Sequence, residues 1–217
     1  MTMICRFAQK ATLSILSACL LAGPVTGIAV AQSADAAQQN ASSVSAPIRG
    51  LYDALKTAQD SGKTAQQRAA IIAPAVDRAF DLEAILRRSV GIRYNSLSAA
   101  DRTHLLGSFR QFTVARYASS FKPGTNAVFT ILPQVRSNPT GGEIVDTTIG
   151  GQGGDATPLN YIMVNGPSGW RITDVLLNAH ISQVAAQRAD FGGALSQGGA
   201  NGLAELLDRK TAHFLHD

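Results

Sequence analysis

Among the side chains of types that can transfer protons, Asp146, Asp174 and Tyr161 are candidates for one catalytic set. Carboxylates and a tyrosine in an apolar pocket carry out such chemistry in some small cone-shaped α+β folds. Each residue also has a structural explanation. Asp146 falls on the solvent side of an alternating strand, Asp174 can bond to a turn or an arginine, and Tyr161 is a typical strand aromatic. The sequence supplies no mutual geometry for the three, so an enzyme stays the alternative hypothesis and we assign no catalytic residue.

Metal and phosphate sites have little support in the sequence. The histidines show no i, i+4 pair around a glutamate, which is the spacing of a helical zinc site; they are His104, His180, His213 and His216. The glycine-rich segment Gly150–Gly154 lacks a following Lys-Ser/Thr and lies between two strands, so it is typical of a hairpin loop. We therefore expect neither a metal site nor a phosphate-binding loop.

The N-terminus predicts a secretory signal peptide over residues 1–31. Arg6 and Lys10 form a positive region, Ala11–Ala22 is apolar, and Ala29–Ala31 is a small-residue cleavage site. The apolar run is shorter than the roughly 20 residues of a membrane span. A competing interpretation is a lipobox over residues 16–19, which would anchor the protein through a lipid on Cys19.

Cleavage after Ala31 would remove both cysteines, Cys5 and Cys19, and leave 186 of the 217 residues. The mature chain could then form no disulfide, a composition compatible with an oxidising envelope compartment. Its 17 basic and 15 acidic side chains give a net charge of +2, compared with +4 for the whole chain. Charge therefore gives no support for a nucleic-acid partner.

The mature chain is expected to form one domain over residues 46–217, preceded by a flexible leader at residues 32–45 that has little to bury. Helical periodicity fills Pro47–Phe121, where Pro47 suits a first helical turn. Thr64, Asp81 and Ser98 are predicted N-caps. Pro74 is expected to break the second helix near Ala73.

Alternating periodicity then predicts four strands joined by short turns, and this indicates an antiparallel meander. The strands are expected at Val128–Pro133, Glu143–Ile149, Leu159–Val164 and Trp170–Leu177. Two helices, Ile181–Leu195 and Asn201–Phe214, are expected to close the chain. The fold class is therefore α+β, with N-terminal helices, a four-stranded antiparallel sheet, and C-terminal helices that pack on the sheet.

Several short motifs occur in one order along the chain. They are Phe80–Ile85, Ala115–Ala118, Gly169–Val175, and Ile181–Val184 followed by Arg188 and Phe191. Together they resemble the MlaC-like family of periplasmic phospholipid-binding proteins, also called toluene-tolerance proteins, over about Ala46–Phe214. The segment from Asp174 to Ala185 is most similar to the hopanoid-biosynthesis-associated, HpnM-like branch.

This resemblance implies a monomeric periplasmic carrier that moves a phospholipid or a hopanoid between an inner-membrane ABC transporter complex and an outer-membrane partner. It also implies an apolar cavity between sheet and helices, with no reaction and no cofactor. The residues expected to face that cavity are Leu86, Phe109, Phe112, Ile131, Tyr161, Met163, Val175 and Ile181. Because alternation gives every strand two faces, it does not say which face borders the cavity. A filled core would indicate a structural envelope protein instead.

Overall fold

The computed structural model describes residues 26–60, 62–151 and 156–216, with side chains from residue 35 onward. Most of the expected signal peptide, both cysteines and the competing lipobox lie outside these ranges. The chain divides into two compact units, residues 1–36 and 37–217, and the fold below is that of the second unit. Within the described ranges, no helix combines the length and the apolar character needed to cross a membrane.

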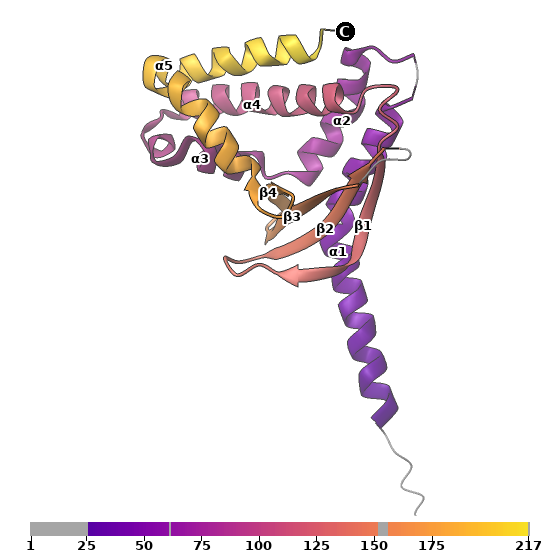
Figure 1. Cartoon of the computed structure of the whole chain (residues 1–217). Coiled ribbons are helices and arrows are strands. Elements are labelled where there is room, and N and C mark those ends of the chain that lie inside the picture. The colour runs from indigo at the N-terminus through magenta and orange to yellow at the C-terminus, as the bar shows by residue number, and fades with distance from the viewer. Residues whose placement is uncertain (1–25, 61, 152–155, 217) are drawn as a thin grey trace, which may run out of the picture. The chain divides into compact units, whose positions relative to one another are not determined.

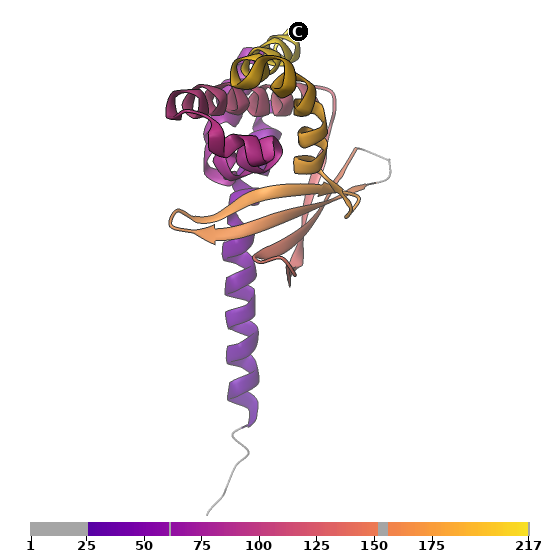
Figure 2. The same ribbon diagram turned by 90° about the vertical axis from the view of Figure 1, so that its left-hand side faces the viewer.

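The fold is α+β, as the sequence predicts (Figure 1). The helices are α1 (Thr26–Ala58), α2 (Ala65–Ala79), α3 (Leu82–Val90), the 3₁₀ helix η1 (Gly91–Ser96), α4 (Ala99–Ser120) and α5 (Gln183–Phe214). The strands are β1 (Val128–Ser137), β2 (Glu143–Gly150), β3 (Thr157–Gly166), β4 (Gly169–Leu177) and β5 (Ile181–Ser182). Helices α2 to α5 gather on one side of the sheet in both ribbon views (Figures 1 and 2).

The sheet is an antiparallel meander in the order β1-β2-β3-β4-β5. All four predicted strands are present, and the two-residue strand β5 forms where the sequence predicted the start of a helix. The register of β1 against β2 shifts between Ile131 and Val135. Pro133 lies within that shift. A proline has no N–H to donate to the hydrogen-bond ladder, so it is tolerated at bulges and on edge strands.

The predicted helix caps are confirmed. Thr64 and Gln67 form the reciprocal capping box of α2, with hydrogen bonds of 3.3 Å and 2.9 Å. The Asp81 carboxylate accepts the amide of the third residue of α3 at 2.9 Å. The Ser98 hydroxyl accepts the amide of Asp101 at 3.1 Å at the start of α4. These bonds satisfy amide groups that a helix end otherwise leaves unpaired.

Two predictions about helix boundaries are wrong. Pro74 does not break α2, which runs on to Ala79, and residues 32–45 belong to the continuous helix α1 rather than to a flexible leader. Each proline inside a helix removes one backbone hydrogen bond, but the stability gained by burying the neighbouring side chains in the core exceeds that loss. Val44 and Ile48 next to Pro47, and Ile72 next to Pro74, are fully buried in the core.

The closing region was predicted as two helices, and the structure has one helical run with a kink. Gly199 interrupts α5 with a φ of 59° and a ψ of −146°. This backbone conformation is readily accessible only to glycine. The kink lies between the two predicted helices, of which the first was expected to end at Leu195 and the second to begin at Asn201.

A buried hydrogen bond ties α1 to the sheet. The Tyr52 hydroxyl donates to Thr147 Oγ1 at 2.8 Å, and the ring of Tyr52 lies 4.6 Å from that of Phe129. We expect Tyr52→Phe to lower the free energy of unfolding by about 1 kcal/mol, because the ring contacts persist while the hydrogen bond is lost. Chemical denaturation of Tyr52→Phe, Thr147→Val and the double variant measures this coupling. Strictly additive effects of the two substitutions would show that the bond contributes nothing.

Candidate ligand pocket

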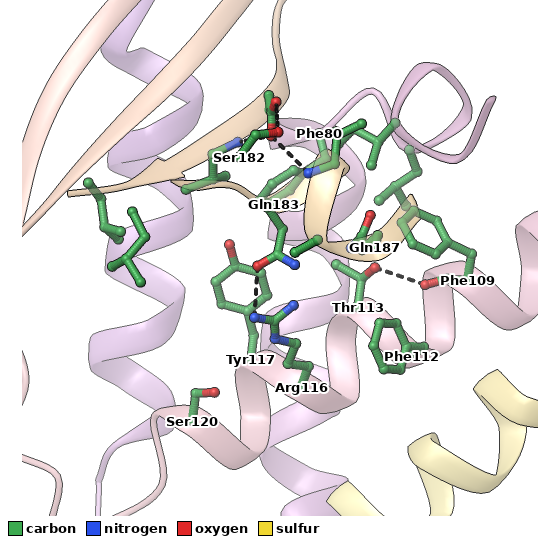
Figure 3. A pocket seen from close by; sticks show the side chains of 18 of the residues that line it. Phe80, Phe109, Phe112, Thr113, Arg116, Tyr117, Ser120, Ser182, Gln183 and Gln187 are labelled. Atoms are coloured by element: carbon green, nitrogen blue, oxygen red, sulfur yellow. Dashed lines mark hydrogen bonds between the residues drawn. The ribbon is translucent and has the colours of Figure 1, made fainter. Parts of the chain in front are cut away.

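A pocket of about 260 Å³ lies between β4 and helices α3, α4 and α5. Its inner wall is aromatic and aliphatic and includes Phe80, Phe109 and Phe112 (Figure 3). These three side chains and that of Ile85, which also lines the wall, are buried. The Phe109 ring is 6.4 Å from that of Phe112. The pocket surface is therefore mainly apolar, as expected for a site that accepts hydrocarbon.

The mouth of the pocket, defined by Ser120, Leu177 and Ile181, is open to solvent. The Leu177 and Ile181 side chains are 39% and 50% exposed, so two large aliphatic groups stand at the entrance. Between them the chain reverses through Asn178 and Ala179, which have positive φ values of 51° and 66°. This tight turn places β5 beside the end of β4.

Asp174 holds together the junction of β4, β5 and α5. It is 5% exposed and accepts hydrogen bonds from the amides of Val175 at 2.8 Å and Val184 at 3.1 Å, and from the Ser182 hydroxyl at 2.6 Å. The Arg88 guanidinium lies 3.9 Å away. A carboxylate at the start of α5 also interacts favourably with the helix dipole. Asp174 thus fixes the part of α5 that borders the pocket.

Polar side chains occupy the region between the aromatic wall and the mouth (Figure 3). The Arg116 guanidinium, from α4, donates to Gln183 Oε1 at 2.8 Å, from the first turn of α5. Tyr117 lies next to Arg116, and burial raises the pKa of its hydroxyl well above the ordinary range, so it remains a neutral hydrogen-bond donor. Gln187 lines the pocket and accepts a hydrogen bond from Ser89 at 3.0 Å.

The structure does not assemble the set of residues that the enzyme hypothesis requires. Asp146 pairs in register with Asn160, so Tyr161, the next residue, points to the opposite face of the sheet. Two hydrogen bonds of 2.7 Å from Arg136 hold the pKa of Asp146 below its usual range. The Asp174 carboxylate already accepts three hydrogen bonds at the junction of β4, β5 and α5. Among the described residues, no group of three or more metal-ligating side chains comes together either.

Four of the eight residues that the sequence placed at the cavity line the pocket: Phe109, Phe112, Val175 and Ile181. The other four are not part of its lining. Leu86, Tyr161 and Met163 are fully buried in the core, and Ile131 packs against the core from β1. Periodicity identifies residues that leave water, but it does not distinguish the wall of a cavity from filled core.

The polar pocket lining includes four residues that were not predicted from the sequence: Arg116, Tyr117, Gln183 and Gln187. A signal for three of them was present, because they belong to the motifs Ala115–Ala118 and Ile181–Val184. These motifs are far apart in the chain and meet in the pocket, where Arg116 contacts Gln183. Motifs that converge in space around a cavity are better candidates for function than either motif alone.

The fold and the sequence of this chain both have matches among known proteins. No curated protein sequence matches the chain. A solved structure of a phospholipid-binding protein from Ralstonia solanacearum, in complex with a phospholipid, superposes with a TM-score of 0.66 at 18% sequence identity. The match covers 79% of this chain and 98% of that one. The family model described as MlaC protein matches residues 47–209, which run from α1 through most of α5. The chain therefore belongs to the MlaC protein family.

Proposed function

We propose that the protein is a carrier that holds a phospholipid with its acyl chains in the pocket and its head group toward the mouth. The observation that carries this proposal is the apolar pocket with an exposed aliphatic entrance, in a fold shared with a phospholipid-bound relative. Withdrawing a methylene from water is worth about 0.8 kcal/mol, so an acyl chain does not enter water unshielded at a useful rate. A protein pocket reduces that cost.

The pocket must widen to accept a whole lipid. Its volume of about 260 Å³ is below the roughly 300–1,000 Å³ of drug-sized ligand sites. We propose that the first half of α5 moves away from α4 as the lipid enters. Gly192 and Gly193 support this, because they weaken the helix and a Cβ at either would meet no atom within 4 Å. The kink at Gly199 provides a boundary for such a movement.

The proposed place of action is the periplasm, reached through the signal peptide expected at residues 1–31. There the carrier would pass phospholipid between an inner-membrane transporter complex and an outer-membrane partner. A hopanoid is the other ligand to test. Mass spectrometry of the mature protein from the soluble periplasmic and the membrane fractions decides the export route, because cleavage after Ala31 and a lipid on Cys19 give different masses.

The experiment for this function has two steps. Protein purified without detergent is extracted with organic solvent, and the extract is analysed by mass spectrometry, which separates phospholipids from hopanoids. Delipidated protein is then mixed with labelled donor vesicles and unlabelled acceptor vesicles. We expect about one lipid per protein and transfer proportional to protein concentration. Absence of both bound lipid and transfer would overturn the proposal, and recovery of hydrolysed lipid would favour the enzyme hypothesis.

A further inference from the structure

One stripe of α4 changes from apolar to polar along the pocket. Phe109, Phe112, Thr113, Arg116, Tyr117 and Ser120 all line it, at the three- and four-residue spacing of one helix face. The stripe covers about 16 Å at 1.5 Å per residue. Phe109 and Phe112 at one end are buried, whereas Ser120 at the other is exposed. An amphiphile placed along this stripe would have its apolar end at the phenylalanines and its polar end beside Arg116.

Arg116 and Asp174 are the two charged residues in the lining, and they do not neutralise each other. None of the ion pairs formed among the described residues involves Arg116. Its partner is the neutral oxygen of Gln183, while Asp174 accepts three hydrogen bonds elsewhere. On the same helix, Arg110 is fully engaged by Asp77 through two hydrogen bonds of 2.6 Å.

A half-buried guanidinium without an anion is costly, and most of its five donors are available to a ligand. The hydroxyls of Tyr117 and Ser120 add donors in the same region and make no hydrogen bond to the described part of the chain. Figure 3 shows the Arg116 guanidinium directed toward Gln183, to which it is hydrogen-bonded, and Tyr117 is the next residue on the same turn of α4. Guanidinium groups bind phosphate through paired, charge-assisted hydrogen bonds.

We propose that Arg116 binds the phosphate of the lipid head group, assisted by the hydroxyls of Tyr117 and Ser120, and so selects phospholipids over lipids without phosphate. This inference rests on the proposed carrier function. Gln183 holds the guanidinium in position across the gap between α4 and α5. Arrival of the phosphate replaces that bond with stronger ionic ones and thereby releases α5 from α4.

The test loads delipidated full-length protein from vesicles that contain phosphatidylglycerol and diacylglycerol with identical acyl chains. The lipid on re-isolated protein is quantified by mass spectrometry for wild type, Arg116→Gln, Arg116→Lys and the control Arg110→Gln. Wild type and the control should prefer phosphatidylglycerol by about tenfold or more, consistent with a hydrogen bond to a charged group. Arg116→Gln should lose that preference through a fall in phosphatidylglycerol loading, and Arg116→Lys should retain part of it.

Other outcomes would overturn the inference. If Arg116→Gln has the melting temperature of wild type and still prefers phosphatidylglycerol to the same degree, Arg116 does not select the head group. That result would not contradict the carrier function. Failure of wild type to load either lipid removes the proposed phospholipid-carrier function itself. A third arm adds inorganic phosphate to lipid-free protein. Thermal stabilisation that requires Arg116, without any preference between the two lipids, would assign the site to free phosphate instead.

Discussion

Replacing Asp174 with alanine should lower the free energy of unfolding by about 3 kcal/mol, the largest stability effect we expect from one substitution. The substitution removes the acceptor of three hydrogen bonds and leaves the Val184 amide and the Ser182 hydroxyl without their partner. It also removes the nearby anion of Arg88. Because these groups position α5 against the pocket, lipid loading should fall together with stability.

Asp81→Ala is the matched control, since Asp81 also caps a helix but accepts one amide hydrogen bond there. Its expected cost is about 1 kcal/mol, the ordinary value of a helix cap. Chemical denaturation of both variants and of wild type gives the comparison. If Asp174→Ala and Asp81→Ala lose the same free energy of unfolding, the hydrogen bonds at the junction of β4, β5 and α5 stabilise the fold no more than an ordinary helix cap does.

Val175→Arg should reduce lipid loading by about tenfold or more, which is the largest functional effect expected outside the polar part of the pocket. Val175 is half-buried on the β4 wall, and an arginine there fills the narrow space and places a second cation near Arg116. An acyl chain cannot share that volume with a guanidinium without leaving the charge poorly solvated.

Val128→Arg provides the control, because Val128 is 54% exposed on β1 and is not part of the lining. The lipid-to-protein ratio after incubation with vesicles is measured for both variants, and circular dichroism checks that each is folded. Val175→Arg should load poorly and Val128→Arg normally. Normal loading of a folded Val175→Arg protein would show that the lipid does not occupy this pocket.

Local sequence signals were sufficient for most of the fold. The caps at Thr64, Asp81 and Ser98 act through atoms within three residues, and the strands follow from alternation, so both are visible in the sequence. Errors arose where distant packing decides the structure. Val44 and Ile72 are fully buried in a core cluster that includes residues far along the chain, such as Leu203, and that burial keeps helices continuous across Pro47 and Pro74.

The pocket was less predictable than the fold for the same reason. Tyr161 and Val175 are paired in register and point to the same face of the sheet, yet they have different roles. Tyr161 is covered by the helix α1, whose Tyr52 ring lies 6.0 Å away, whereas Val175 faces a space that α4 and α5 leave open. A cavity forms where no side chain of another element covers the strand. The sequence pattern of one strand does not indicate where that happens.

Photocrosslinking tests whether an acyl chain lies along the α4 stripe. Delipidated protein is loaded with a phospholipid that carries a photoreactive group at the end of one acyl chain, irradiated, and mapped by peptide mass spectrometry. We expect labelling of the segments around Phe109 and Phe112 on α4 and around Val184 on α5, with little labelling in Val175→Arg. Labelling confined to exposed strand residues such as Val128 and Leu132, or unchanged by Val175→Arg, would contradict it.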